Sequence, residues 1–506
     1  MDAAAVSSGY TTDIVYPSAF GVFQAPIHLA YAASLGGRAA PRLDGAAFTY
    51  CDLGTGAGLT LCVLADCYPE AQFHGVDINP EHVRRGRALA EAAGLSNVTF
   101  HEAGFADLGR LSLPALDFVA MGGVYSWIAP ELRAACLSFA RDRLTERGAV
   151  FVHYGALPGN SQIDALYALL RETAAGIEGD SLTRFAEACR IVEGLRAAKA
   201  RFFQYNPFAA AWMDQVAGQD PRAMAHEVLN AQRASLWAAD VAAEARAAGL
   251  SYVANAQLEL NDLGLCAPPD MREALARLAP AAREMALDTL RNANSRMDVL
   301  MRADAPAEAA PPSLWLDRMT RGPLAAERQA LGRRARLDLS DPLYADILAE
   351  TEHGAARLPQ LLAAPGLEGR EGLRLAVERL IALKLVNVLR RPYAPVRPGA
   401  GDLSMPSRLN RLVLEGQVEA AGALPFASPV AGTQVLLPLE DRLALLAMLG
   451  GDLSAAWERL RASGRTLKHE GKAVASAADL AAAAQARAAA IGEPMTTQLQ
   501  GLGVLA

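Results

Sequence analysis

The chain is poor in the residues that small secreted proteins and all-β proteins use most. Its six cysteines include no CxxC pair, which argues against a disulfide framework and against a thiolate metal site. Aromatic residues make up only 6% of the sequence, although hydrophobic residues reach 52% and alanine is plentiful. This composition excludes wholesale disorder, and it favours helix-rich packing over an all-β sandwich.

The sequence also lacks an excess of positive charge and a long uninterrupted apolar run. Its 48 Lys and Arg against 55 Asp and Glu give a net charge of −7, which argues against a surface built wholly for nucleic acid. The uncharged stretch 420–439 contains three prolines and two glycines, so it would make a poor membrane helix. The start of the chain has no secretory pattern, and no His, Cys or Asp cluster has metal-ligand spacing. We therefore expect a cytoplasmic protein without a bound metal.

Short apolar runs alternate with amphipathic stretches between residues 47 and 154. This regular alternation predicts an α/β fold, a doubly wound Rossmann-like parallel sheet with helices on both faces. Asp77 and Asp117 lie at or beside predicted strand ends, where such sheets bind their ligands. The predicted strands are 48–53, 73–77, 98–102, 116–121 and 149–154, and the predicted helices are 59–67, 81–93 and 131–144.

The pattern changes after residue 158, and it divides the chain into four predicted parts. Residues 1–158 form the ligand-binding core, and 159–302 form a helical insertion that breaks near 205–207. The insertion ends in two strand-like runs, 252–258 and 297–301, which could close the sheet as an antiparallel pair. A proline-rich linker over 304–313 then leads to a mainly helical region, divided into a middle domain (314–391) and a C-terminal domain (407–506).

The middle domain contains a predicted helix over 373–381 followed by a strand over 385–389. Helix then strand is compatible with a winged-helix unit, but a packing module is favoured over nucleic-acid binding. Near the end of the chain, the alanine-rich run 473–490 predicts an exposed or weakly packed helix.

Three glycines follow the first predicted strand in the run Asp52-Leu53-Gly54-Thr55-Gly56-Ala57-Gly58. Glycines allow a tight turn and a close approach of the backbone to a ligand. A dinucleotide fingerprint, GxGxxG, would need glycine at position 59, where the chain has Leu59. The observed GxGxG spacing suits S-adenosylmethionine, which has no pyrophosphate that needs helix N–H groups. Asp77 ends the next strand, 77 − 56 = 21 residues after Gly56, where its carboxylate could accept both ribose hydroxyls.

These motifs resemble class I S-adenosylmethionine-dependent methyltransferases that carry a methyltransferase regulatory domain, of which the rickettsial-type protein lysine methyltransferases are members. The resemblance is strong over residues 10–302. It implies S-adenosyl-L-methionine as the cofactor, a protein or peptide lysine as the acceptor, and a homodimer. The further matching motifs are Tyr10…Tyr16-Pro17-Ser18, Gly123-Val124-Tyr125-Ser126-Trp127, Tyr154-Gly155-Ala156-Leu157-Pro158-Gly159 and His226-Glu227-Val228-Leu229-Asn230.

The resemblance also implies two sets of site residues. The acceptor set consists of Tyr125, Trp127 and Tyr154, whose ring faces suit an amine through cation–π contact. We expect Tyr10 and Tyr16 to fold over this set. His153 and His226 are candidate acid–base groups, although a structural role is favoured for each. The cofactor set consists of Tyr16, Asp52, Gly54, Thr55, Gly56, Gly58, Asp77, Ile78, Asn79, Gly104, Phe105, Ala106, Met121 and Gly122.

Two differences from the family leave the acceptor open. Gly122 stands where the family tends to have His, and Gly155 where it tends to have Asn. Smaller residues at these positions could admit a different acceptor, so a small molecule or a peptide natural product is the alternative substrate. An alternative of another class is a regulatory protein that senses S-adenosylmethionine. In each case we expect the region after 313 to select or dock the partner and to perform no chemistry.

Overall fold

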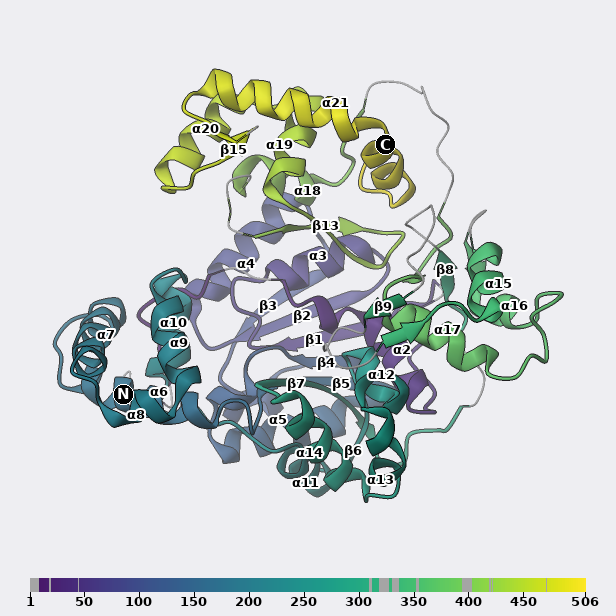
Figure 1. Cartoon of the computed structure of the whole chain (residues 1–506), viewed down its shortest axis with the longest axis horizontal. Coiled ribbons are helices and arrows are strands. Elements are labelled where there is room, and N and C mark those ends of the chain that lie inside the picture. The colour runs from purple at the N-terminus through teal and green to yellow at the C-terminus, as the bar shows by residue number, and fades with distance from the viewer. Residues whose placement is uncertain are drawn as a thin grey trace.

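The computed structural model describes residues 9–17, 20–43, 45–308, 312–317, 327–329, 336–351, 355–393, 403–417, 420, 422–469 and 471–506. A seven-stranded mixed sheet lies at the centre of this structure (Figure 1). Its strand order is β3-β2-β1-β4-β5-β7-β6. The strands are β1 (Thr49–Leu53), β2 (Gln72–Asp77), β3 (Val98–Glu102), β4 (Leu116–Met121), β5 (Leu144–Gly155), β6 (Leu250–Asn255) and β7 (Ser295–Arg302).

The direction of the strands confirms the predicted Rossmann-like sheet. Strands β1 to β5 pair in parallel, whereas β7 pairs antiparallel with both β5 and β6. The two strands at the end of the insertion therefore close the sheet as the sequence predicted. The fifth strand begins at Leu144, five residues earlier than the predicted start at 149.

Helices cover both faces of the sheet because apolar side chains alternate along each strand. Tyr50 and Phe118 face one side, whereas Cys51 and Val119 face the other. The first side is covered by α2 (Pro26–Leu35), α3 (Leu59–Cys67) and α4 (Pro80–Ala93). The second side is covered by α5 (Pro130–Arg143), α11 (Ala238–Ala247) and the 3₁₀ turn η2 (Phe105–Arg110). A second 3₁₀ turn, η1 (Val22–Gln24), precedes α2.

The helical insertion has a hydrophobic core of its own, which includes Leu170, Phe185 and Val192. The predicted break near residue 206 is present, since one helix ends at Tyr205 and the next begins at Pro207. The insertion helices are α6 (Ser161–Ala175), α7 (Ser181–Ala197), α8 (Arg201–Tyr205), α9 (Pro207–Val216) and α10 (Pro221–Leu229). Between β6 and β7 the chain forms η4 (Leu258–Asn261), α12 (Leu263–Cys266), η5 (Pro269–Met271), α13 (Arg272–Ala276) and α14 (Pro280–Arg291).

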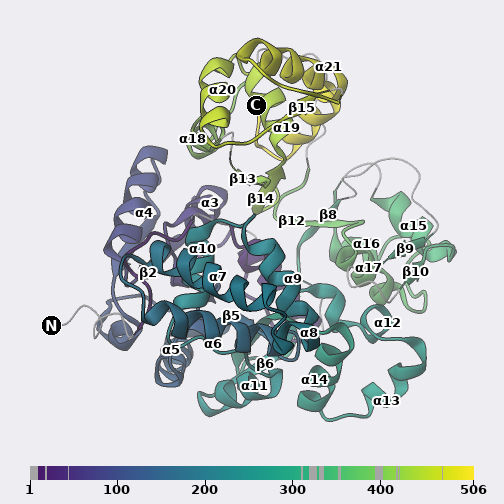
Figure 2. The ribbon, with the colours of Figure 1, turned by 60° about the vertical axis from the view of Figure 1, so that its left-hand side comes forward.

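The chain beyond the sheet forms two lobes on different sides of the core (Figure 2). The middle lobe has a helix, strand, helix, helix, strand order compatible with a winged-helix unit, and β8 occupies the centre of its three-stranded sheet. Its elements are β8 (Trp315–Asp317), β9 (Glu327–Gln329), β10 (Arg336–Asp338), α15 (Pro342–Glu350), β11 (Ala356–Arg357), α16 (Leu358–Leu362), α17 (Leu373–Ala382) and β12 (Asn387–Leu389). The second lobe contains α18 (Arg408–Gln417), β13 (Leu424–Ser428), β14 (Thr433–Leu437), α19 (Leu439–Met448), α20 (Leu453–Ala462), β15 (Lys468–His469), β16 (Lys472–Ala473) and α21 (Ala477–Gly501).

Both lobes pack on the core around the central sheet through a continuous set of buried apolar residues. Strands β13 and β14 contact α3, and α18 contacts α4 (Figure 1). The guanidinium of buried Arg390 pairs with Glu70 and stacks on Tyr68, 4.5 Å from the ring centre. The predicted helix over 473–490 is largely exposed, as expected, but it is not weakly packed, because α21 buries Leu480, Ala483 and Ala484 and packs against α19.

The six cysteines of the chain are free thiols, and four of them are buried. Across the described part, no helix combines the length and the apolar character needed to span a membrane. Within the same ranges, no three His, Cys, Asp or Glu side chains come together in a way that could hold a metal ion. Ser18 of the predicted motif and residues 309–311 of the predicted linker lie outside the described residues.

Candidate functional site

The glycine loop between β1 and α3 adopts a backbone conformation that only glycine takes without strain. Gly54, Gly56 and Gly58 have φ of +78°, +57° and +77°. A Cβ at Gly54 would overlap Val124, and one at Gly58 would lie 2.5 Å from the ring of Phe100. A Cβ at Gly56 would have no heavy atom within 4 Å. The side chains of Val124 and Phe100 therefore pack against the two ends of the loop, while Gly56 faces open space.

The carboxylate of Asp77 holds this loop at the carboxyl end of β2. Its Oδ2 accepts the N–H of Gly56 at 2.8 Å, and its Oδ1 accepts the N–H of Asn79 at 2.9 Å. Asp77 is only 6% exposed. Because each carboxylate oxygen can accept two hydrogen bonds, Oδ2 retains acceptor capacity for a ligand.

His82, which the sequence analysis missed, connects Asp77 to the N-terminal segment. Its Nε2 lies 3.1 Å from the backbone N–H of Tyr16 and must accept that hydrogen. The ring proton therefore lies on Nδ1, which donates to Asp77 Oδ1 at 3.2 Å. The only signal in the sequence was position, since His82 falls in the first turn of α4, five residues after Asp77.

Asp52 is the penultimate residue of β1, beside the glycine loop, and is 3% exposed. Its pKa is raised to about 7, mainly because the carboxyl is buried and also because of the nearby charge of Asp77. The nearby polar side chains of Thr55 and Gln24 act in the opposite direction and favour the ionised form. The site thus contains two carboxyl groups on adjacent strands, one of which titrates near neutrality.

The remaining predicted cofactor residues line the ends of β2, β3 and β4. Ile78 approaches Gly104, whose built Cβ would lie 3.5 Å from its Cδ1, and the ring of Phe105 lies close to Gly54. Asn79 instead caps α4, because its Oδ1 accepts the N–H of Glu81 at 3.0 Å. Met121 is buried, Gly122 half-buried and Ala106 exposed. The fold therefore brings most of the predicted set to one edge of the sheet.

Two of the three predicted acceptor residues are held in the core by carboxylates. Tyr125 is fully buried and donates its hydroxyl to Glu244 of α11. Tyr154 is also fully buried, and its hydroxyl donates to Asp298 of β7 at 2.7 Å. We therefore withdraw both from the acceptor set, because neither ring has an exposed face. Trp127 is half-buried in the turn after β4 and stays a prediction.

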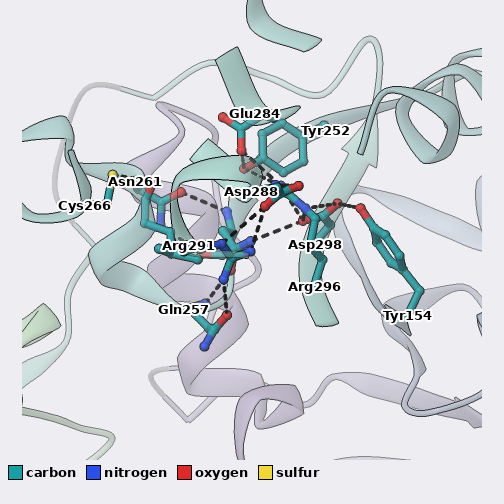
Figure 3. A network of polar contacts seen from close by, with 12 residues as sticks. Tyr154, Tyr252, Gln257, Asn261, Cys266, Glu284, Asp288, Arg291, Arg296 and Asp298 are labelled. Carbon is teal, nitrogen blue, oxygen red and sulfur yellow. Dashed lines mark hydrogen bonds and ion pairs between the residues drawn. The ribbon is translucent and has the colours of Figure 1, made fainter. Parts of the chain in front are cut away.

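The hydrogen bond of Tyr154 belongs to a larger buried network (Figure 3). At its centre lies the guanidinium of Arg296, which contacts Asp298 at 2.9 Å, Glu284 at 3.0 Å and Asp288 at 3.0 Å. Arg291 makes a further contact with Asp288 at 2.9 Å. The network joins α14 to β7 and β5, so it fixes the second half of the sheet.

Asp117 does not lie at the ligand-binding edge, and the prediction for it is wrong. It is the second residue of β4, so it lies at the amino end of the parallel strands. Its Oδ2 accepts the N–H of Thr49 at 2.9 Å, and its Oδ1 accepts the hydroxyl of Thr145 at 3.0 Å. Asp117 therefore fixes the entry to β1 and β5.

The N-terminal segment packs against α10 of the insertion. The rings of Tyr10 and Tyr16 lie 5.5 and 5.4 Å from the ring of His226 on α10. The Nε2 of His226 donates to the carbonyl of Ile14 at 3.1 Å, and burial lowers the pKa of this histidine to about 4. His226 is thus neutral and structural. Asp13 in the same segment caps α7 by accepting from the N–H of Ser181 at 2.9 Å.

The two glycines that differ from the family do not leave free space. A Cβ at Gly122 would overlap Oε1 of Gln24. A Cβ at Gly155 would lie 3.1 Å from Nδ2 of Asn160 and 3.4 Å from Oγ of Ser126. Neighbouring polar side chains therefore occupy the volume that the sequence analysis assigned to a different acceptor.

Comparison with family models identifies two domains in the chain. Residues 44–154 match a methyltransferase domain, and residues 220–302 match a predicted methyltransferase regulatory domain. The first range contains the glycine loop and β1 to β5, and the second contains α10 to β7. The chain therefore carries both domains, which confirms the resemblance drawn from the sequence.

Comparison with individual proteins extends this result. An uncharacterized protein of Synechocystis sp. is 31% identical over 300 residues, which are 58% of each chain. One of Rickettsia prowazekii is 25% identical over 283 residues, or 55% of this chain and 50% of the relative. The chain thus spans little more than half the length of these curated relatives. PKMT2 from Rickettsia typhi, solved in complex with AdoHcy, shares the fold with a TM-score of 0.68 at 16% identity, over 97% of this chain and 99% of that one.

Proposed function

We propose that this chain, through its methyltransferase domain, binds S-adenosyl-L-methionine at the glycine loop and transfers the methyl group to the side-chain amine of a protein lysine. The observation that carries the cofactor assignment is the open side of Gly56, whose N–H is fixed on a buried acid at the carboxyl edge of a parallel sheet. In this proposal Asp77 accepts the ribose hydroxyls, Ile78 and Phe105 contact the adenine, and Asp52 faces the methionyl ammonium.

The proposed chemistry is an in-line displacement. The lone pair of the acceptor nitrogen attacks the methyl carbon, the carbon–sulfur bond breaks, and the sulfonium becomes the neutral thioether of S-adenosylhomocysteine. A lysine amine has an ordinary pKa of about 10.4, so it must lose a proton to solvent before it attacks. The protein contributes mainly by desolvating and aligning the two reactants. Trp127, which follows β4, is the remaining candidate to contact the acceptor.

The proposed acceptor is a protein because the fold is shared with PKMT2 over nearly the full length of both chains. The argument for a small-molecule acceptor weakens, because Gln24 and Asn160 occupy the space beside Gly122 and Gly155. The alternative of a sensor that binds S-adenosylmethionine without transferring its methyl group is separated from an enzyme by the experiment below.

A homodimer forms part of the proposal, through a different surface from the one suggested by the sequence. The apolar helix faces of the C-terminal region pack on the core of the same chain and need no partner. Large apolar side chains are instead exposed on the insertion, where Tyr205 is 69% and Phe208 50% exposed. Light scattering should give the mass of a dimer, and Phe208→Ser should shift it towards the monomer. A monomeric wild-type protein would remove this part of the proposal.

The experiment that tests the function has two stages. Titration calorimetry should detect binding of S-adenosylmethionine and S-adenosylhomocysteine, and Gly56→Val should abolish it. Intact-mass spectrometry of candidate proteins, peptides and metabolites after incubation with methyl-labelled cofactor should then show the mass of one or more labelled methyl groups added to a protein or peptide lysine. No binding of either ligand would overturn the cofactor assignment, and labelling of metabolites alone would overturn the acceptor. Binding without any labelling would favour the sensor.

A further inference from the structure

The start of α4 links the proposed ribose-binding acid to the backbone of the N-terminal segment at two points. Asn79 donates its backbone N–H to Asp77 Oδ1 at 2.9 Å and its Nδ2 hydrogen to the carbonyl of Thr12 at 3.4 Å. His82 donates from Nδ1 to the same Oδ1 at 3.2 Å, and its Nε2 accepts the N–H of Tyr16 at 3.1 Å. Asn79 is 2% and His82 1% exposed, so these hydrogen bonds are shielded from water.

The two carboxylate oxygens of Asp77 have different surroundings. Oδ1 accepts two hydrogen bonds, from Asn79 and His82, which fill the acceptor capacity of a carboxylate oxygen. Among the described residues, Oδ2 accepts one hydrogen bond, from the N–H of Gly56. The donors on Oδ1 therefore set the direction in which Oδ2 faces the glycine loop and the ligand that is proposed to bind there.

The position of the ring proton on His82 depends on Tyr16. A ring nitrogen that accepts a hydrogen bond carries no proton, so the N–H of Tyr16 fixes the proton on Nδ1. If the N-terminal segment moved away, the proton could lie on Nε2 instead, and Nδ1 would then present a lone pair to Asp77. Two acceptors that face each other repel, so the carboxylate would lose one of the two hydrogen bonds that orient it.

The N-terminal segment is itself anchored on the helical insertion. The carboxylate of Asp13 accepts the N–H and the hydroxyl of Ser181, at the start of α7, at 2.9 and 2.8 Å. His226 of α10 donates from Nε2 to the carbonyl of Ile14 at 3.1 Å. Residues 9–17 therefore form a bridge between the insertion and the cofactor site, and His82 lies where this bridge meets the site.

We propose that His82 is a positioning residue of the cofactor site, and that the docked N-terminal segment, by fixing the ring proton on Nδ1, keeps the Asp77 carboxylate turned towards the ribose of S-adenosylmethionine. The affinity for the cofactor is in this way coupled to the contacts of residues 9–17 with the insertion. This inference rests on the proposed function, since the ligand is the cofactor assigned there.

Two substitutions at His82 separate its donor from its other contacts. His82→Asn places an amide Nδ2 where the ring has Nδ1, so the donor to Asp77 stays and no longer depends on Tyr16. His82→Leu removes both the donor and the acceptor. In calorimetry with S-adenosylhomocysteine, His82→Leu should bind about tenfold more weakly than wild type, and His82→Asn within about threefold. Neither variant can accept the N–H of Tyr16, so a purely structural role would weaken both alike. Circular dichroism monitors the fold.

A substitution at the insertion end of the bridge tests the coupling. Asp13→Ala removes the anchor on Ser181 and should weaken binding about fivefold in the wild-type chain, but less than about twofold in the His82→Asn background, where the donor is fixed. Asp180→Ala is the matched control, because Asp180 caps the same helix by accepting the N–H of Thr183 at 2.8 Å. The control should bind within about 1.5-fold of wild type.

Equal affinities of His82→Leu and His82→Asn, whether both fall or neither does, would overturn the role of the Nδ1 donor. An Asp13→Ala variant that binds as tightly as the Asp180→Ala control, or that loses the same factor in both backgrounds, would overturn the coupling. If a His82 variant does not fold, Asp13→Ala against Asp180→Ala in the wild-type chain still decides. Failure of the wild-type protein to bind S-adenosylhomocysteine would instead overturn the proposed function, so the two failures are distinguishable.

Discussion

The two halves of the central sheet present their polar groups in different ways. In the half formed by β1, β2 and β3, Asp77 and His82 accept backbone N–H groups of the glycine loop and of the N-terminal segment, and Gly56 stays uncovered. In the half formed by β4, β5 and β7, the hydroxyls of Tyr125 and Tyr154 are bound by carboxylates more than 100 residues away. The first half is arranged to receive a ligand, whereas the second half is arranged to hold the sheet together.

Gly56→Val is the largest expected break in the first half. Valine is strained at φ +57°, and its side chain would enter the open space at which the cofactor is proposed to bind. We expect S-adenosylmethionine binding to weaken by more than about 1,000-fold, or about 4 kcal/mol, in calorimetry. Gly37→Val, which combines a φ of +70° with the same open surroundings on an exposed turn, is the control for backbone strain. Equal affinity in both variants would show that the open side of Gly56 receives no ligand.

Arg296→Met is the largest expected break in the second half. It leaves Glu284 and Asp298 without their guanidinium partner, and Asp288 with Arg291 alone. Breaking a buried ion network in this way should lower the free energy of unfolding in urea by about 3–5 kcal/mol. Arg302→Met on the same strand removes a surface pair with Asp304 and should cost less than about 1 kcal/mol. Similar losses for the two variants would mean that the buried network contributes no more than a surface pair.

Trp127→Ala tests whether the second half also has an acceptor-facing residue. We expect turnover to fall at least about tenfold while the Kd of S-adenosylmethionine stays within about threefold, because the lost contact is made with the acceptor. Single-turnover assays and calorimetry measure the two quantities separately. A parallel loss of turnover and of cofactor binding would assign Trp127 to the packing of the turn.

Tyr125→Phe is the smallest expected effect and the most direct check of the comparison. The change removes one hydroxyl and leaves Glu244 bound by Arg133 at 2.8 and 3.0 Å. Burial raises the pKa of Tyr125 well above its ordinary value, so the hydroxyl stays protonated as a donor. We expect a loss of about 1.5 kcal/mol in unfolding free energy and turnover within twofold. A tenfold loss of turnover at unchanged stability would return Tyr125 to the acceptor set.

The features that the sequence predicted are those whose causes are local. The glycine spacing and the alternation of apolar runs predicted the loop, the sheet and the position of Asp77 at a strand end. Asp117 on β4 is a carboxylate, as Asp77 on β2 is. The two differ in position, because Asp117 lies near the start of its strand and Asp77 at the end of its strand. The predicted strand 116–121 already placed Asp117 at its amino end, so the error came from treating both ends of a strand as ligand-binding.

The features that the sequence did not predict depend on distant partners. Tyr125 and Tyr154 were assigned to the acceptor site from their place after strands, but Glu244 and Asp298 decide where their hydroxyls point. The side chain of Gln24 lies against Gly122, 98 residues further along the chain (122 − 24), and no spacing rule connects the two. His82 was missed because its role comes from a backbone N–H of the N-terminal segment.

The packing of β13 and β14 on α3 has a consequence for how the protein is made. Helix α3 is synthesised directly after the glycine loop, but hydrogen-bond partners of its last two residues are synthesised much later. Asp66 accepts the hydroxyl of Ser407, and the thiol of Cys67 donates to the carbonyl of Thr433. At synthesis rates of about 5–20 residues per second, the interval lasts about 20–70 s. During this time the face of α3 that contacts β13 and β14 has no cover, although its other side packs against β2, β3 and α4, so we expect the nascent chain to depend on chaperones until its last lobe has been translated.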